Sequence, residues 1–188
     1  MNHISGKRTG RFVRDERGVS ALEFALVAPI IFALLAVVVD FGMLVQTRAN
    51  METALSSAMS FGLARGQDVD AAEAAGYAAS LADIASTQLG EDTALNVTLN
   101  RSFITTRGRG SAGQTGSANA VSLCYCPERK PSGIDWGTSR ICTAPCPNGG
   151  HAGLFLAIKA ARPYRPLFLD YGLVSDGQIV IETLAGLR

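Results

Sequence analysis

The sequence predicts an α+β fold that begins with a long N-terminal membrane-spanning helix extended into an amphipathic helix. A second helix and a small antiparallel sheet of three or four strands, with a disulfide-stapled loop, complete the prediction. Three observations support it. An apolar run of membrane length lies near the N-terminus, helical spacing of apolar residues gives way to alternation after residue 90, and four cysteines are confined to residues 124–146. Runs of helix followed by runs of strand are typical of α+β proteins.

The first 18 residues are polar and basic. They contain five arginines and lysines against two acidic residues, which leaves a local net charge of +3 in a chain whose net charge is only +1. A basic segment before an apolar run is typical of a membrane-directed N-terminus. We interpret residues 1–18 as a cytoplasmic leader. The nearly neutral whole chain offers no electrostatic case for a nucleic-acid partner.

Residues 19–45 are predicted to form the transmembrane helix. Between residues 24 and 45 the single charged side chain is Asp40. A helix of that length rises roughly 33 Å, close to the hydrocarbon thickness of a bilayer. Pro29 should kink it modestly. The positive-inside rule places the leader in the cytoplasm and the rest of the chain outside. We therefore expect a single-pass membrane protein with its N-terminus in the cytoplasm and its head outside.

Residues 46–90 are predicted to form extracytoplasmic helices. The first continues the membrane helix with an apolar face and ends at Gly66; its apolar positions are Ala49, Ala54, Leu55, Ala58, Met59 and Gly62. The second covers residues 68–89, with Asp68 or Asp70 as N-cap and Gly90 as terminator. Its stripe comprises Ala74, Tyr77, Ala78, Leu81, Ile84, Ala85 and Gln88.

Residues 91–188 are predicted to form the head sheet, with a cysteine-rich loop at 107–150. Apolar and polar residues alternate over 94–106, which indicates a half-buried strand. Residues 107–119 are rich in glycine and serine and are predicted as a surface loop. Further strands are expected over residues 120–126, 154–161 and 178–184.

The cysteines are expected to form two disulfides, because they lie on the oxidising side of the membrane. They are Cys124, Cys126, Cys142 and Cys146. Four thiolates could instead hold zinc, but their spacing is not a common zinc pattern, so no metal or cofactor is expected. We favour Cys124–Cys146 with Cys126–Cys142, and the pairing Cys124–Cys142 with Cys126–Cys146 is almost equally compatible with the spacing. Trp136 is expected to anchor this loop by packing.

The N-terminal motif resembles a known family. Gly18 to Phe24 read GVSALEF, and Pro29 and the run Asp40, Phe41, Gly42 follow. This pattern is similar to the N-terminus of TadE-like pseudopilins of the Tad (Flp, type IVb) pilus assembly system. Residues 160–168 (AARPYRPLF) and Arg188 resemble the family's tail. The resemblance implies that a prepilin peptidase cuts between Gly18 and Val19, and that the helix packs with other pilins and pseudopilins. It also implies a bacterial inner membrane, with the head in the periplasm.

Glu23 would be the fifth residue of such a mature chain. A carboxylate at the head of an apolar helix can pair with the N-terminal ammonium of a neighbouring helix in a bundle, and each charge alone is costly in lipid. This would make Glu23 a device that fixes the register between subunits. The alternative is an interfacial side chain that reaches the head groups at the cytoplasmic edge.

Asp40 and Gly42, further along the helix, are less informative about function. Asp40 lies near the outer end of the span, and we interpret it as a solvated interfacial residue rather than as a member of an ion pair. Gly42 could allow close contact between helices.

No catalytic constellation is readable, since the only histidines are His3 in the leader and His151 in a loop. The sequence therefore favours a structural, non-enzymatic protein, a minor pseudopilin acting in pilus assembly through helix packing. The alternative is an unprocessed, signal-anchored periplasmic binding or adhesion module whose glycine- and cysteine-rich loops bind a ligand.

Overall fold

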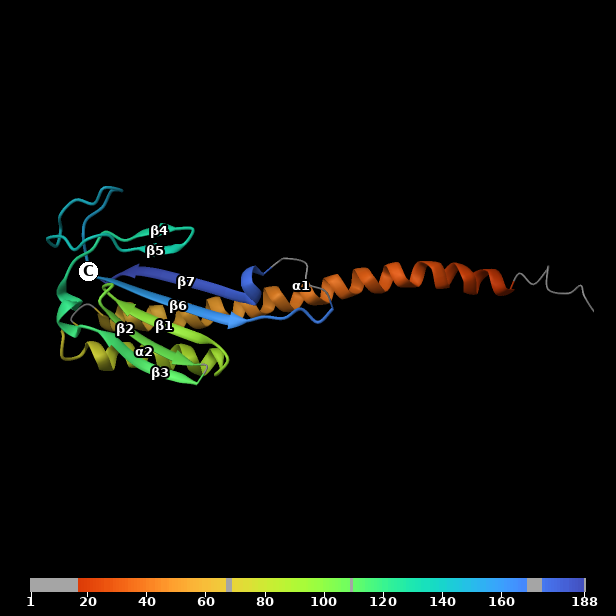
Figure 1. Cartoon of the computed structure of the whole chain (residues 1–188), viewed down its shortest axis with the longest axis horizontal. Helices are drawn as coiled ribbons and strands as arrows, with labels where there is room; N and C mark the ends of the chain where they lie inside the picture. Colours follow the sequence, from red (N-terminus) through yellow and green to blue (C-terminus); the bar gives the residue numbers. More distant parts are fainter. Residues whose placement is uncertain (1–16, 67–68, 109, 169–173, 188) are drawn as a thin grey trace, which may run out of the picture.

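The computed structural model describes residues 17–66, 69–108, 110–168 and 174–187. It consists of a two-layer head and one long helix, α1 (Arg17–Arg65), whose N-terminal part projects away from the head (Figure 1). This arrangement confirms the predicted fold class. Residues 1–16 of the leader and Arg188 lie outside the described residues.

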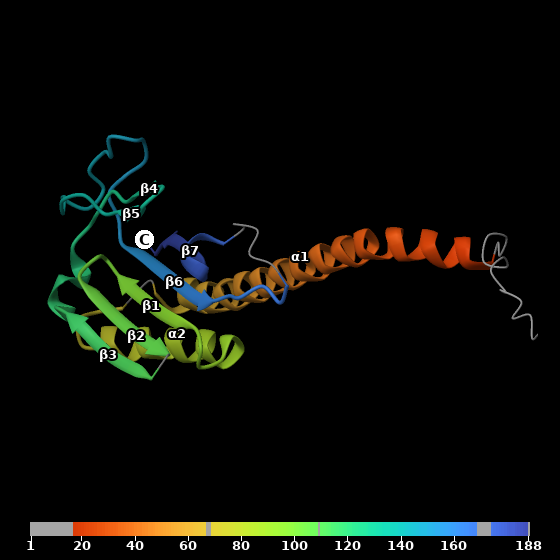
Figure 2. The same ribbon diagram turned by 45° about the vertical axis from the view of Figure 1, so that its right-hand side comes forward.

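Helix α1 is continuous through Pro29 and curves gently along its length (Figure 2). Proline has no N–H, so the carbonyl of Ala25 loses its partner within the helix at that point. The helix ends at Arg65, and Gly66 follows it as predicted.

The C-terminal part of α1 buries one face against the head. Met51, Ala54, Leu55, Ala58 and Met59 are buried at spacings of three and four residues. The predicted contribution of Ala49 is wrong, because it lies about 200° around the helix from Met51 and is exposed.

Helix α2 (Ala74–Leu89) begins later than predicted, because a turn precedes it. Asp70 Oδ1 accepts hydrogen bonds from the N–H groups of Ala72 (2.8 Å) and Glu73 (2.9 Å), so Asp70 caps this turn. Gly90 ends the helix at a φ of 75°, where its N–H donates to Ser86 O. Gln88 is exposed, and Leu89 is buried in its place.

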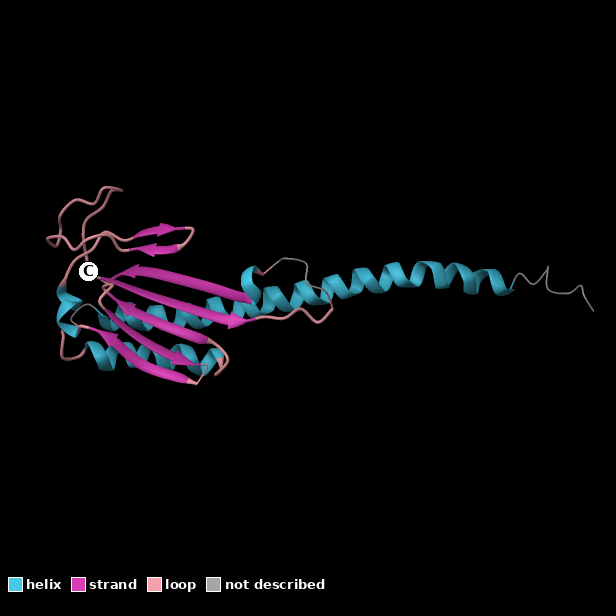
Figure 3. Cartoon of the chain, viewed as in Figure 1, coloured by secondary structure: helices cyan, strands magenta, loops and turns pink. Residues whose placement is uncertain are grey.

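The sheet is antiparallel throughout, with the strand order β3-β2-β1-β6-β7. Its strands are β1 (Ala94–Leu99), β2 (Phe103–Gly108), β3 (Ser111–Gly116), β6 (Phe155–Pro163) and β7 (Gln178–Gly186). Helices α1 and α2 cover one face of it (Figure 3). In β1 the predicted alternation is confirmed, since Leu95, Val97 and Leu99 are all buried.

Two predicted segments contain an extra turn or strand. Residues 94–106 form a β1–β2 hairpin, because Asn100 and Arg101 turn the chain at positive φ (46° and 62°). Residues 107–119 are not only a loop, since they include β3 at the sheet edge, where every residue is exposed. The large sheet therefore has five strands rather than three or four.

The strand predicted over residues 120–126 is wrong. This region contains the 3₁₀ helix η2 (Ala118–Ser122), followed by isolated bridges from Cys124 to Arg140 and from Tyr125 to Gly153. A small ribbon, β4 (Glu128–Lys130) and β5 (Gly133–Asp135), lies beyond it. A short 3₁₀ turn, η3 (Ser175–Gly177), precedes β7.

Candidate functional site

The N-terminal half of α1 carries no packing partner in the described part of the chain. We call residues 19–39 the bare half and residues 40–65 the packed half. The most apolar 18-residue window of the helix has a mean hydropathy of 2.7, and none of it is buried. Its large exposed side chains are Val19, Leu22, Phe24, Leu26, Val27, Ile30, Ile31, Phe32, Leu34, Leu35, Val37, Val38 and Val39. Such a helix fits a membrane anchor.

The predicted cleavage site lies in the first turn of α1. Gly18 is the second residue of the helix and Val19 the third. The first N–H groups of a helix have no partner within it, so this end opens more easily than the middle. Cleavage between Gly18 and Val19 remains a prediction.

Glu23 is the single charged residue of the bare half. It is exposed and makes no ion pair or side-chain hydrogen bond within the described residues. The partner predicted for it belongs to a neighbouring molecule. The ion pair therefore also remains a prediction.

Asp40 is where the helix meets the head. Its side chain is only 2% exposed, and both carboxylate oxygens accept backbone hydrogen bonds. Leu167 N–H donates to Oδ1 (2.8 Å) and Phe168 N–H donates to Oδ2 (3.1 Å). The hydroxyl of Tyr164 donates to the Asp40 backbone carbonyl (2.9 Å). The interpretation of Asp40 as a solvated residue is wrong, because it holds a segment more than 120 positions away in sequence.

We call residues 164–168 the junction loop. It follows β6, and Figure 1 shows the chain after β6 reaching along α1 toward the bare half. Its start is tied to the head as well, since Tyr164 N–H donates to Gly177 O (2.9 Å). Desolvation, aided by the negative charge of Asp40, raises the pKa of the Tyr164 hydroxyl, which therefore remains a hydrogen-bond donor at neutral pH.

The other residues of the helix motif do not share this contact. Phe24 and Phe41 are exposed, and a Cβ placed on Gly42 would meet no atom. Of the motif's residues in the second half of the span, only Asp40 is buried by the head. The contact joins the helix motif to residues 160–168, whose likeness to the family's tail remains a prediction.

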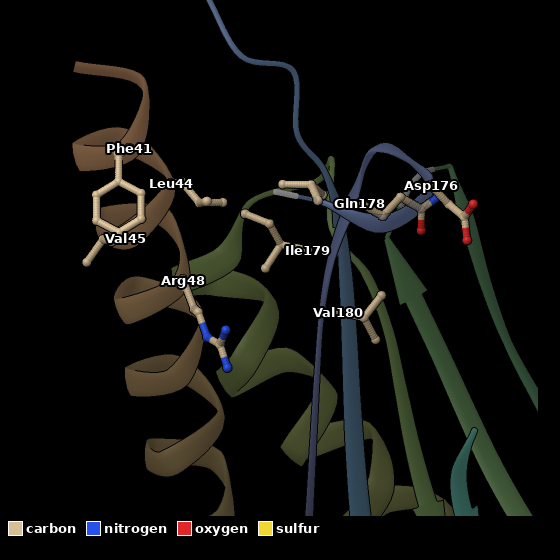
Figure 4. A pocket seen from close by; sticks show the side chains of 9 residues that line it. Phe41, Leu44, Val45, Arg48, Asp176, Gln178, Ile179 and Val180 are labelled. Atoms are coloured by element: carbon tan, nitrogen blue, oxygen red, sulfur yellow. The ribbon is translucent and has the colours of Figure 1, made fainter. Parts of the chain in front are cut away.

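An open groove of about 670 Å³ lies beyond the junction (Figure 4). On one side α1 contributes Phe41, Leu44, Val45 and Arg48. The other side comes from the start of β7 and the residues before it, including Asp176, Ile179 and Val180. No sequence pattern indicated this groove, because its two walls are far apart along the chain.

The four cysteines form two disulfides, Cys124–Cys142 and Cys126–Cys146. The predicted bridging is confirmed, but the favoured pairing is wrong. Arg140 N–H donates to Cys124 O, which brings Cys142 close to Cys124, and Cys146 lies in a separate turn closed onto Gly150. The two segments are thus not arranged as the hairpin that the favoured pairing requires.

The cysteine-rich loop is also fixed by side chains. Trp136 packs edge-on against the buried Tyr125, with ring centroids 6.1 Å apart, as its predicted packing role requires. Asn100 is buried at the hairpin turn, where its amide donates to Val121 O and accepts from Phe155 N–H.

His151 is exposed. No group of three or more potential metal ligands occurs among the described residues.

Comparison with known proteins gives one finding. Residues 18–59 match the family model described as TadE-like protein. No curated protein and no solved structure matches the chain. The matched segment contains the bare half and most of the packed half, including Asp40, and it suggests involvement in Tad pilus assembly. The resemblance predicted from the N-terminal motif is therefore confirmed: residues 18–59 are similar to the TadE-like family.

Proposed function

We propose that this chain is a minor pseudopilin that acts in Tad pilus assembly by packing its N-terminal helix against other pilins and pseudopilins. One observation carries the proposal: residues 19–39 are apolar on all sides and uncovered, and their single charge is Glu23. A helix of this kind is stable only in lipid or within a bundle of similar helices.

Glu23 supplies the specificity that apolar packing lacks. Apolar side chains are nearly interchangeable in lipid, so van der Waals contact alone fixes a register poorly. Cleavage after Gly18 would free the amine of Val19, four residues before Glu23. An aligned neighbour would then place its ammonium near the carboxylate. A misaligned one would leave two unpaired charges in lipid, at a cost of roughly 3–5 kcal/mol.

The proposed orientation places the leader in the cytoplasm and the head in the periplasm. The basic leader supports it through the positive-inside rule. The two disulfides support it independently, because such bonds persist on the oxidising side of the membrane. A prepilin peptidase of the membrane is the proposed processing partner.

The N-terminus of the mature protein tests processing directly. The experiment is intact mass and N-terminal sequencing of the membrane-extracted chain. The proposal expects a start at Val19, with Gly18→Leu blocking cleavage because it obstructs the residue before the scissile bond. A chain that still begins at Met1 in cells with an active prepilin peptidase would favour the signal-anchored binding module instead.

A second experiment separates assembly from processing. Glu23→Ala and Glu23→Gln should both abolish incorporation into the assembly while leaving cleavage largely intact, because the charge is proposed to act after cleavage. Glu52→Ala is the matched control, since Glu52 is a carboxylate on the same helix, exposed and paired only with Arg48. Normal pilus formation by both Glu23 variants would contradict the register role.

A further inference from the structure

We propose that the junction loop is a second membrane contact, in which Leu167 and Phe168 insert into the interface of the bilayer next to the outer end of α1. This inference rests on the proposed function, since it requires that the bare half spans the membrane. It adds a lipid-binding surface on the head, a part of the chain that the family match does not cover.

The depth of the loop is fixed by Asp40. The bare half rises roughly 30 Å between residues 19 and 39, which matches the hydrocarbon thickness of a bilayer. Its outer edge therefore falls at Asp40. The backbone N–H groups of Leu167 and Phe168 lie 2.8 and 3.1 Å from the oxygens of that same residue. The loop is thereby held level with the outer edge of the apolar region.

The junction loop exposes two apolar side chains while hydrogen bonds to Asp40 hold its backbone. Leu167 is 66% exposed and Phe168 is 58% exposed. Two adjacent large apolar side chains at this level have no cover in the described part of the head. Their backbone is bonded to Asp40, so they lie beside the outer end of the bare half, which needs lipid or another helix around it.

The polar groups around the loop fit an interface. Arg165 is exposed two residues before Leu167, and a guanidinium can bind lipid phosphate while its stem lies along apolar surface. The carboxylate of Asp40 is not bare at this depth, because two backbone N–H groups satisfy it. The junction thus removes the charge of Asp40 from the lipid while it offers Leu167 and Phe168 to it.

The function of the contact follows from its geometry. A single helix would leave the head free to tilt relative to the membrane plane. A second contact, fixed to the helix by Asp40 and to η3 through Tyr164, restricts this tilt. The heads of neighbouring subunits would then stand at the same angle and height above the membrane.

The test uses the full chain reconstituted in phosphatidylcholine–phosphatidylglycerol vesicles and measures quenching of tryptophan fluorescence by lipids brominated on their acyl chains. The native Trp136 is first replaced by phenylalanine, which keeps an aromatic ring against Tyr125. Single tryptophans are then placed by Phe168→Trp and, in a second protein, by Leu167→Trp. Retention of both disulfides in each protein verifies the fold of the cysteine-rich loop.

Two further tryptophans calibrate the measurement. Phe32→Trp lies in the middle of the bare half and reports whether the helix is in lipid. Ile141→Trp replaces an apolar side chain that is 85% exposed in the cysteine-rich loop and serves as the solvent control. An interfacial side chain lies roughly 5–10 Å into the boundary, so Phe168→Trp should lose about half of its fluorescence, while Ile141→Trp should lose none.

Adding Asp40→Ala to Phe168→Trp should reduce this quenching, because the loop is then released. If Phe32→Trp is quenched but the tryptophans at 167 and 168 both behave like Ile141→Trp, the second contact is wrong and the membrane span stands. If Phe32→Trp is also unquenched, the span and the contact are both wrong.

Discussion

The two halves of α1 belong to one uninterrupted helix but differ in how their apolar residues are distributed around it. In the packed half, buried residues such as Met51, Leu55 and Ala58 recur every three or four positions, and the exposed positions between residues 46 and 60 are mostly polar. In the bare half, apolar side chains project in every direction. Helical propensity is thus shared along the element, and the distribution of apolar residues around the helix decides which surroundings each half requires.

Asp40 marks the change from one half to the other. It is the first buried residue of the helix, and the head touches the helix from this point onward. The predicted boundary of the span at residue 45 is thus about five residues beyond the first contact with the head. A charged residue near the end of an apolar run can therefore attach another segment of the chain, and need not be solvated.

The largest expected effect comes from placing a charge in the bare half. Ile30→Arg should lower membrane insertion by about 3 kcal/mol, since arginine at the centre of a spanning helix is costly. Ser56→Arg, at an exposed position of the packed half, should insert normally. The readout is the fraction of chains with all four cysteines oxidised, because only a translocated head meets an oxidising compartment. Equal oxidation in the two variants would remove the distinction between the halves.

Removing the attachment at the boundary should have the next largest effect. Asp40→Ala deprives two backbone N–H groups of a charged acceptor, and each such bond contributes roughly 1.5–3 kcal/mol. Chymotryptic cleavage after Leu167 or Phe168 in detergent micelles should therefore accelerate at least about tenfold. Glu52→Ala on the same helix loses only an exposed pair worth roughly 0.2–0.5 kcal/mol and should cleave like the parent.

Packing within the second half can be tested at Gly62. A Cβ there would lie 2.6 Å from Leu156 Cδ2 and 3.2 Å from the Tyr77 hydroxyl, so Gly62→Ala should cost roughly 1–3 kcal/mol of unfolding free energy. Gly76→Ala on α2 faces open space and should stabilise the head by about 0.5–1 kcal/mol. Thermal unfolding of the head in micelles measures both. A neutral Gly62→Ala would mean that α1 and α2 are not in close contact.

The smallest effect is expected at the buried hydroxyl between these helices. Tyr77 donates to Gly62 O (2.7 Å), and Tyr77→Phe should cost about 1 kcal/mol at neutral pH. Burial raises the pKa of the Tyr77 hydroxyl to about 12, above its unfolded value of about 10. The unfolded state therefore loses its proton first, and stability present below pH 10 should fall as the pH rises toward 12. Tyr77→Phe should lose less stability over this range.

The parts of the fold that follow a simple period could be predicted from the sequence. The apolar run of α1, the alternation of β1 and the capping by Asp70 of the turn before α2 each depend on neighbouring residues. The edge strand β3 could not be predicted in this way, because its six residues are small or polar and all exposed. Its strand conformation comes from pairing with β2, which local composition does not reveal.

In the candidate site, too, only the residues with a local sequence signal could be predicted. Glu23 and the predicted cleavage site at Gly18 stand out because a charge and a glycine border an apolar run. The burial of Asp40 depends on residues 167 and 168, and the disulfide pairing depends on how residues 140 and 150 fold back. Such contacts join distant segments, and one sequence does not specify them. The positive φ of Asn100 had a local signal, since asparagine tolerates this conformation, but it was missed.

The central claim is that lipid or neighbouring helices surround residues 19–39 and water surrounds the outer face of residues 49–60. Single cysteines introduced along α1 of the full chain, probed in intact membranes with a water-soluble maleimide, test it most directly. We expect no labelling of cysteines that replace Phe24, Ile31 or Val38. Cysteines that replace Glu52, Ser56 and Ser60 should label readily. Labelling of Ile31 as rapid as that of Ser56 would contradict it.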